Sequence, residues 1–513
     1  MSAPAEIAID PGAVPLEALR RIARGDGVIA LGHETWQRID ACHARLDEAV
    51  AAGGTIYGVN TGFGKLAGTR IGKADLATLQ RNLILSHCTG SGPELGDEVI
   101  RLVLILKAIG LARGYSGVRR EIVAMLAALL GHGVYPCVPA KGSVGASGDL
   151  TPLAHLSATL IGVGEATRGG RRMPAAEALA AAGLRPIALA PKEGLALING
   201  TQVSTALALA GLFAAEDVFA AAIVAGALAV EAARGSSVPF DARIHAVRGH
   251  QGQIDVAAVF RSLFKGSGIM AEHENRHRVQ DPYSLRCQPQ VMGALLDAMR
   301  FVAKTLIIEA NAVSDNPLIF ADEGDVLSGG NFHAEPVAIG ADLLAIALSE
   351  MGAMSERRIA FLVDASLSGL PPFLVEASGL NSGFMVAQIS AAALASENKS
   401  LAHPASVDSI PTAANQEDHV SMATFAARRL GEIADNVRGI VAIELMAAAQ
   451  GLEFRRPLQS SPALEEAHAL VRTRVAPYRE DRRFAEDIAA LKEMIAEGAF
   501  TRFARGILPS HAG

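Results

Sequence analysis

The sequence predicts a mainly α-helical protein whose core is a bundle of long helices. Half of the 513 residues are apolar but only 4% are aromatic, so alanine, valine, isoleucine and leucine must fill the core. Small aliphatic residues in long runs are typical of closely packed helices. Several segments keep apolar residues at three- and four-residue spacing for about twice the mean helix length of roughly 11–12 residues, as in a long-helix bundle.

The chain is long enough for more than one domain, and we expect a division near residue 200. The N-terminal domain, residues 1–200, alternates helical patterns with glycine-rich breaks. Helical patterns lie at residues 16–52, 75–86 and 95–111, and breaks at residues 56–64, 132–148 and 165–193. After the break at 132–148, Thr151 followed by Pro152 predicts the N-cap and the first residue of a helix.

Residues 201–513 are expected to form the long-helix bundle domain. The predicted long helices cover residues 206–230, 292–312, 339–362 and 422–449. The first of them is the most apolar segment and predicts either a buried helix pair or one long core helix. Glu216 and Asp217 divide it into runs well short of the roughly 20 residues that span a bilayer. We therefore expect a soluble protein that does not enter the membrane.

Charge and cysteine usage exclude several function classes. A formal charge of -7 gives no basic footprint for nucleic acid or an acidic membrane. The four cysteines lie far apart without a Cys-x-x-Cys pair, which argues against a disulfide scaffold or zinc ribbon and fits a reducing cytoplasm. Residues 1–15 show no signal peptide. His273, Glu274 and His277 resemble metal ligands, but a charged helical or loop face explains them, and we predict no metal site.

The tripeptide Ala146-Ser147-Gly148 has a special chemical possibility. Because glycine has no side chain, the Gly148 nitrogen can approach the Ala146 carbonyl and close a five-membered ring. Loss of two waters then leaves a methylidene group conjugated to a carbonyl, an electrophile that no ordinary residue supplies. A helix beginning at Thr151 would point its positive end toward this loop. An isolated Ala-Ser-Gly is more commonly a flexible turn before a helix.

Two other glycine-rich motifs do not fit. A nucleophile elbow requires Gly-x-Ser-x-Gly, but Asp149 stands two residues after Ser147 and no strand clearly precedes it. A phosphate-binding loop requires Gly-Lys followed by serine or threonine, but Leu66 follows Gly64-Lys65.

Residues 145–155 (GASGDLTPLAH) resemble the cofactor segment of the aromatic amino acid ammonia-lyase family, which forms methylidene-imidazolone (MIO) from Ala-Ser-Gly. Further blocks resemble the family in the same order and extend over most of the chain: residues 57–64 (YGVNTGFG), 195–201 (LALINGT), 280–287 (QDPYSLRC), 329–332 (GGNF) and 415–419 (NQEDH). The resemblance implies a long-helix fold of the fumarase/aspartase-like superfamily. It also implies an MIO made from Ala146, Ser147 and Gly148 without an external cofactor, and a homotetramer whose active sites combine residues of three subunits.

Eliminating ammonia from an amino acid requires a carboxylate anchor, a way to make the amine leave, and a base for an unactivated β-proton. Arg286 suits the anchor because its planar guanidinium binds a carboxylate bidentately. Asn199 alone resembles a turn residue, but the family resemblance implies an amide partner for the substrate carboxylate or the imidazolone oxygen. The resemblance also places Gln280 among the substrate-binding residues, and Phe332 could stack on the substrate ring or the MIO.

Tyr57 and Tyr283 are two of only five tyrosines, and both lie in polar segments rather than in apolar helical stripes. The resemblance places Tyr57 on a mobile lid loop as the residue that abstracts the proton, and Tyr283 beside the MIO. A phenol acts as a base near neutral pH only where a positive potential stabilises its anion. Glu417 is the competing candidate for the base.

Two positions indicate which amino acid is used. Ser86-His87 stands where histidine-specific family members carry Ser-His, whereas relatives that use tyrosine or phenylalanine tend to carry His-Leu or Phe-Leu. A buried imidazole needs a hydrogen-bond partner, which His87 provides. Glu417 is an acid where those relatives have a non-acidic or shorter side chain. We therefore expect elimination of ammonia from L-histidine to give trans-urocanate, the first step of histidine degradation.

Three alternatives stay open. The substrate could attack the MIO through its amine or through its imidazole ring. The enzyme could be a tyrosine or phenylalanine ammonia-lyase, or an aminomutase with the same cofactor. The chain could also be a helical binding protein without catalysis, in which Ala146-Ser147-Gly148 is a plain turn.

Overall fold

The computed structural model describes residues 6–25, 27–272 and 279–511. Two compact units, each discontinuous in sequence, make up the chain. The first comprises Met1–Ala210, Ala303–Asp342 and Pro404–Arg428, and the second comprises Gly211–Val302, Leu343–His403 and Arg429–Gly513. The division into domains at residues 1–200 and 201–513 stays a prediction. His273, Glu274 and His277 lie outside the described residues.

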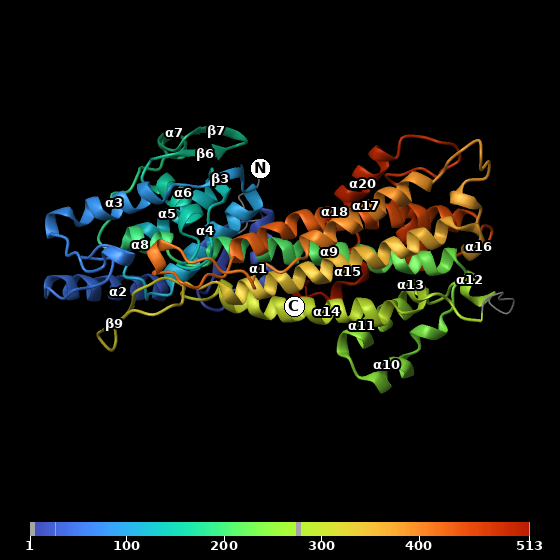
Figure 1. Ribbon diagram of the computed structural model, residues 1–513, viewed down its shortest axis with the longest axis horizontal. Coiled ribbons are helices and arrows are strands. Elements are labelled where there is room, and N and C mark those ends of the chain that lie inside the picture. The colour runs from blue at the N-terminus through green and yellow to red at the C-terminus, as the bar shows by residue number, and fades with distance from the viewer. Residues whose placement is uncertain (1–5, 26, 273–278, 512–513) are drawn as a thin grey trace. The chain divides into compact units, whose positions relative to one another are not determined.

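Long helices dominate the described part of the chain and confirm the predicted mainly α fold (Figure 1). The longest are α9 (Gln202–Ala232), α14 (Gln288–Ala310), α15 (Glu335–Val363) and α18 (Ala423–Glu453). The most apolar segment forms one continuous helix, α9. Although α9 and α15 are long and apolar enough to cross a membrane, 89% and 67% of their most apolar windows are buried inside the protein. Such burial is typical of core helices.

Within the second unit, the long helices approach one another closely. A Cβ atom at Gly226 of α9 would lie 1.9 Å from Gln288 Oε1 at the start of α14. Arg358 of α15 and Glu444 of α18 form a fully buried ion pair, with Nη2 and Oε2 2.8 Å apart. A buried pair of this kind holds two helices in one register, because either charge alone would be costly to bury.

The second unit also contains shorter helices. They are α10 (Ala242–Arg248), α11 (Gln251–Phe264), α12 (Gly268–Ala271), α13 (Tyr283–Arg286), α16 (Ala365–Ser368), α17 (Met385–Leu401), α19 (Pro462–Arg472) and α20 (Phe484–Ala496).

The first unit combines medium-length helices with small sheets. Its helices are α1 (Leu16–Arg24), α2 (His33–Ala51), α3 (Leu76–His87), α4 (Asp97–Ala112), α5 (Arg120–Gly131), α6 (Leu150–Leu160), α7 (Ala175–Ala181) and α8 (Glu193–Ile198). β1 (Glu6–Ile9) pairs in parallel with β2 (Val28–Leu31). The antiparallel pairs are β3 (Ser91–Glu94) with β5 (Pro139–Lys141), β4 (Val134–Pro136) with β6 (Glu165–Arg168), β6 with β7 (Arg171–Pro174), and β8 (Leu318–Phe320) with β9 (Asp325–Leu327).

The packing of α6 against α3 and α8 brings three functional segments together. The last residue of α3 is His87, α6 begins three residues after Ser147, and Asn199 directly follows α8. The ends of these helices therefore meet at one place, although their residues are far apart in the sequence.

The predicted start of α6 was wrong by two residues. The helix begins at Leu150, so Asp149 occupies the N-cap position and Thr151 lies inside the helix. The Thr151 hydroxyl instead shares a hydrogen bond of 3.2 Å with the Thr89 hydroxyl. The breaks predicted at residues 132–148 and 165–193 contain β4 to β7 and α7, because these strands are too short to give a periodic signal.

Candidate active site

A cavity of about 1330 Å³ lies in the first unit. Its wall contains most of the residues predicted to act on a substrate: Tyr57, His87, Ala146, Ser147, Asn199, Phe332 and Glu417. These residues come from separate loops and helix ends of that unit. The fold thus collects around one cavity segments that lie far apart in the sequence.

The predicted cofactor tripeptide is held from two sides. Asn199 Nδ2 donates to the Ser147 carbonyl oxygen at 2.7 Å. The Ser147 hydroxyl donates to Glu417 Oε1. Ala146 is only 4% exposed, so its carbonyl lies away from solvent while the Ser147 side chain faces the cavity.

Gly148 has no room for a side chain. Its φ is +78°, and a Cβ atom would lie 2.3 Å from the Gly200 carbonyl oxygen. The two glycines form a short parallel bridge, and the next backbone N–H, that of Asp149, donates to Gly200 O at 2.7 Å. Only glycine tolerates both this conformation and this close approach.

Asp149 anchors the end of the tripeptide loop. Its fully buried carboxylate accepts from the Ser204 N–H at 2.7 Å and the Ser204 hydroxyl at 2.9 Å. It also accepts from the Ser143 hydroxyl at 3.0 Å and the Thr424 hydroxyl at 2.6 Å. A buried carboxylate with four donors is well satisfied, and it joins the loop rigidly to the start of α9.

These features fit an MIO at residues 146–148. Gly148 lies in a backbone cradle that a Cβ would fill, as ring closure through its nitrogen requires. The Ser147 carbonyl oxygen, which would become the ring carbonyl, already has an amide donor. Asn199 Oδ1 is buried and has no hydrogen-bond partner among the described residues, so the same amide can also accept from an incoming N–H.

Tyr57 lies in the turn between α2 and the following short helix, and its phenol reaches the cavity. Its Oη accepts a hydrogen bond from the Gly64 N–H at 3.0 Å. Gln80 Nε2 donates to the Gly58 carbonyl at 3.1 Å and fixes the turn against α3. A donor directed at Oη stabilises negative charge on that atom.

His87 presents one defined ring nitrogen to the cavity. Its Nδ1 lies 2.8 Å from the Leu83 carbonyl oxygen, which can only accept, so Nδ1 carries the proton. In the neutral ring, Nε2 is therefore a bare acceptor. Burial lowers the pKa of His87 from its usual 6.5, while the Leu83 carbonyl and the charge of Glu417 oppose that shift.

Glu417 lies at the end of a strained turn. Ala413, Ala414 and Asn415 have φ values of 48°, 54° and 63°, which non-glycine residues rarely adopt. The Thr412 hydroxyl donates to Glu417 Oε2 at 2.5 Å. The turn therefore holds the carboxylate against Ser147 at a cost in backbone strain, as is common where a side chain is positioned for function.

Gln280, Tyr283 and Arg286 belong to the second unit and do not line this cavity. Tyr283 is 71% exposed, and the Arg286 guanidinium lies 4.9 Å from the centroid of its ring. Arg286 Nε is buried without a hydrogen-bond partner among the described residues. Tyr283 and Arg286 therefore contact each other on the second unit, apart from the cavity lining.

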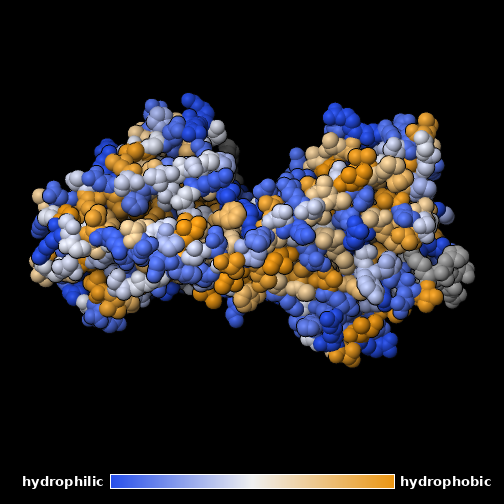
Figure 2. Space-filling model, viewed as in Figure 1, coloured by the Kyte–Doolittle hydropathy of each residue, from blue (hydrophilic) through white to orange (hydrophobic). Residues whose placement is uncertain are grey.

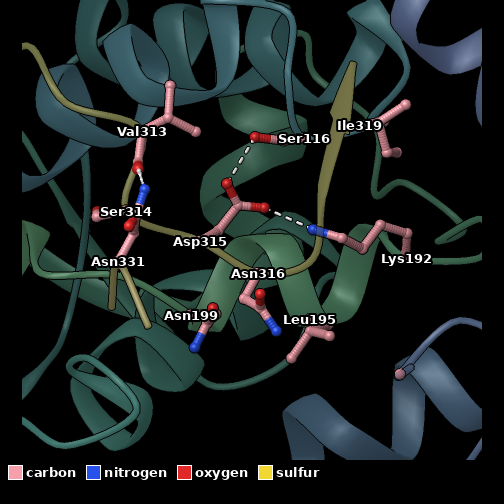
Figure 3. Close-up of polar contacts among 12 residues, drawn as sticks. Ser116, Lys192, Leu195, Asn199, Val313, Ser314, Asp315, Asn316, Ile319 and Asn331 are labelled. Atoms are coloured by element: carbon pink, nitrogen blue, oxygen red, sulfur yellow. Dashed lines mark hydrogen bonds and ion pairs between the residues drawn. The ribbon is translucent and has the colours of Figure 1, made fainter. Parts of the chain in front are cut away.

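Asn316 lines the cavity without any signal in the sequence. It donates to the Ser328 hydroxyl at 2.9 Å and accepts from the Gly329 N–H at 2.7 Å. The preceding Asp315 is buried and binds Ser116 Oγ at 2.8 Å and Lys192 Nζ at 2.5 Å, as Figure 3 shows. Only the folded structure shows that this ion pair directly precedes the cavity-lining Asn316.

His333, Glu335 and His419 were not predicted as a group. One potential ligand atom of each lies within 4.8 Å of the others. His333 and His419 stack with ring centroids 5.6 Å apart, and His333 Nε2 is 3.3 Å from the His419 carbonyl oxygen.

Comparison with known proteins identifies the family. The aromatic amino acid lyase family model matches residues 14–473. The chain belongs to this family. A histidine ammonia-lyase of Rhodospirillum rubrum is 63% identical over 496 residues, which are 96% of each chain. Family membership confirms the predicted carbon–nitrogen lyase class.

Solved structures of the family share the fold. A histidine ammonia-lyase from Trypanosoma cruzi is 40% identical with a TM-score of 0.91, covering 98% of this chain and 96% of that chain. A tyrosine aminomutase from Streptomyces globisporus is 36% identical with a TM-score of 0.93, covering 97% and 98%. The predicted long-helix fold of this superfamily is confirmed. Because both reactions occur on this fold, the residues of the cavity must distinguish them.

Proposed function

We propose that this chain eliminates ammonia from L-histidine to give trans-urocanate, without oxidation or an external cofactor. The observation that carries the proposal is the position of His87 and Glu417 on the same cavity as Ser147. Two hydrogen-bonding side chains there suit an imidazole, which a purely apolar pocket would reject. The high identity to a histidine ammonia-lyase supports the same substrate.

The MIO made from Ala146, Ser147 and Gly148 would supply the electrophile that makes the substrate amine a leaving group. Asn199 Nδ2 holds the Ser147 carbonyl oxygen and stabilises negative charge that develops on it. The N-terminus of α6, which begins at Leu150, adds a favourable dipole at the same loop.

Tyr57 removes the β-proton in this proposal, and Glu417 orients the substrate. Glu417 is also the competing candidate for the base that removes the β-proton. The Gly64 N–H supports the phenolate because it donates to Tyr57 Oη. His87 Nε2 accepts the imidazole N–H, and Phe332 covers the ring. Burial lowers the pKa of His87, which keeps the ring neutral and able to accept near neutral pH.

We further propose that the working enzyme is a cytoplasmic homotetramer in which another copy supplies Tyr283, Arg286 and Gln280. Apolar side chains exposed on the long helices support such an assembly: Phe301 is 56% exposed, and Ile339 and Ile346, on one face of α15, are 51% and 50% exposed. Figure 2 shows hydrophobic residues on the surface of the single chain. Exposed apolar surface of this kind is typical of subunit interfaces.

Complementation tests the shared sites. Tyr57→Phe and Arg286→Ala are each expected to be nearly inactive alone. Co-expressed, they should regain part of the wild-type rate, because some sites then combine an intact Tyr57 with an intact Arg286 from another subunit. A co-expressed mixture no more active than its parents would contradict sites shared between subunits.

Product analysis tests the reaction itself. The purified full chain is incubated separately with L-histidine, L-tyrosine and L-phenylalanine, and ammonia and organic products are measured. Urocanate and ammonia in equal amounts are expected from histidine. Coumarate, cinnamate or a β-amino acid in place of urocanate would overturn the substrate and favour the aminomutase or the other ammonia-lyases.

The His87→Leu substitution tests substrate selection. It is expected to raise KM for histidine by about tenfold or more, because the substrate imidazole loses its acceptor. MIO formation, read from peptide mass, should be unchanged. Since burial lowers the pKa of His87 below 6.5, the acceptor is lost only at lower pH.

The dependence of kcat/KM on pH is measured for wild type and for His87→Leu. Because the substrate titrates equally in both experiments, the ratio of the two values at each pH isolates the titration of His87. This ratio should be highest at neutral and alkaline pH, and it should fall to half at a pH below 6.5. A ratio that falls to half at pH 6.5 or above would contradict a His87 ring whose pKa is lowered in the cavity.

A further inference from the structure

Lys107 is a buried lysine for which the proposed reaction has no role. It lies on α4 within the apolar run Leu102 to Leu111 and is 1% exposed. Its Nζ donates to the main-chain carbonyl of Asn199 at 2.6 Å. Burying a lysine amine costs free energy unless it is hydrogen-bonded, so its position beside this particular carbonyl requires an explanation.

The Asn199–Gly200 turn contacts the tripeptide Ala146-Ser147-Gly148 at two points. The Asn199 side chain donates to the Ser147 carbonyl at 2.7 Å. The Gly200 backbone lies against Gly148, and the Gly200 carbonyl oxygen accepts from the Asp149 N–H at 2.7 Å. The Asn199 carbonyl oxygen and the Gly200 nitrogen belong to one rigid peptide plane, so a donor that fixes the oxygen also fixes the Gly200 backbone.

We propose that Lys107 is a positioning residue for formation of the MIO. Through its hydrogen bond to the Asn199 carbonyl, it fixes the Asn199–Gly200 peptide plane and so holds Ser147 and Gly148 in the geometry of ring closure. This inference rests on the proposed function, because it presumes that the tripeptide cyclises.

The step that Lys107 supports is balanced without an oxidant or reductant. The Gly148 nitrogen bonds to the Ala146 carbonyl carbon. The carbonyl oxygen leaves as water with the protons of the Gly148 and Ser147 nitrogens. The Ser147 hydroxyl leaves as a second water with the Ser147 α-proton. Ring closure brings two backbone groups into contact, so its rate depends on how firmly the loop is held.

The chemistry of Lys107 suits a permanent anchor. Burial lowers its pKa to about 7, with Asp315 opposing the shift, Lys192 adding to it and Asp149 opposing it. Both the neutral amine and the ammonium donate hydrogen bonds, so the contact with Asn199 O survives across neutral pH. Without Lys107, that carbonyl would be a buried acceptor lacking its side-chain donor, and the peptide plane would be free to rotate.

Lys192 provides a matched control. It is also fully buried in the first unit, but its Nζ pairs with Asp315 at 2.5 Å. In Figure 3 its side chain points to Asp315 and not to Asn199. Lys192→Met therefore removes a buried amine from the same region without touching the turn, and it separates a general loss of stability from a loss of positioning.

The experiment follows cyclisation in the full chain by peptide mass. Wild type, Lys107→Met and Lys192→Met are isolated soon after synthesis, and the fraction of the Ser147 peptide lacking two waters is recorded against time. Circular dichroism confirms that each variant is folded before its peptide mass is compared. In Lys107→Met, cyclisation should be slower than in wild type by about fivefold or more, as expected for loss of one buried hydrogen bond. Lys192→Met should cyclise at close to the wild-type rate.

If Lys107→Met does not fold, Lys107→Gln replaces it. Glutamine keeps a polar end but is one bond shorter, so with α4 in place its amide falls short of Asn199 O, and the same slowing is expected. Wild-type cyclisation in a folded Lys107 variant, or equal slowing in Lys192→Met, would overturn the positioning role. A wild-type peptide that never loses water would instead overturn the proposed function, so the two failures are distinguishable.

Discussion

Replacing Ser147 by alanine is expected to lower kcat for histidine by at least about 10³-fold. Alanine has no hydroxyl to lose as water, so no methylidene can form and the substrate amine remains a poor leaving group. The fold should persist, because the Ser147 carbonyl still accepts from Asn199 and Gly148 still lies against Gly200. The measurement is urocanate production together with a thermal melt.

The exposed serine Ser91 provides the control for this substitution. It lies on β3 and does not line the cavity. Ser91→Ala should have wild-type activity and peptide mass. If Ser147→Ala kept wild-type activity, the tripeptide would be a plain turn and the electrophile would have to come from elsewhere.

Tyr57→Phe is expected to reduce kcat by about 10²–10⁴-fold, the usual effect of removing a general base. KM should change little, because the aromatic ring that lines the cavity is retained. The Ser147 peptide should still lose two waters, since Tyr57 has no contact with residues 146–148 among its hydrogen bonds in the described chain. Steady-state kinetics and peptide mass together measure both effects.

Glu417→Gln distinguishes the two candidate bases. Glutamine keeps the size of the side chain and an oxygen that accepts from the Thr412 hydroxyl, but it cannot take up a proton. If Tyr57 is the base, Glu417→Gln should affect KM more than kcat. A larger loss of kcat in Glu417→Gln than in Tyr57→Phe would assign proton abstraction to Glu417.

The long helices could be predicted because their signal is local. Apolar periodicity predicts residues 339–362, and α15 extends over Glu335–Val363. Its start was missed because Glu335 and Pro336 belong to the polar first turn, where helices commonly carry acids and proline. The short strands β4 and β5, of three residues each, are defined by pairing with distant segments and leave no such periodic pattern.

The residues of the candidate site also divide into those that the sequence predicts and those that only the folded structure shows. Tyr57, Ser147 and Asn199 stand in glycine-bearing blocks whose residue types already indicate special backbone geometry, so their loops could be named from the sequence. Lys107 could not, because a single lysine in an apolar helix gives no sign of the carbonyl that it meets. Nor does the sequence show that Arg286 is absent from the cavity lining of the single chain, since that depends on tertiary packing.

The most direct test of the account is the mass of the wild-type peptide that contains Ser147. The purified full chain is digested, and the peptide carrying Ala146-Ser147-Gly148 is compared with the mass that the sequence requires. We expect a mass lower by two waters, alongside urocanate formation by the same preparation. An unmodified mass in a preparation that converts histidine to urocanate would contradict the MIO and with it the central claim.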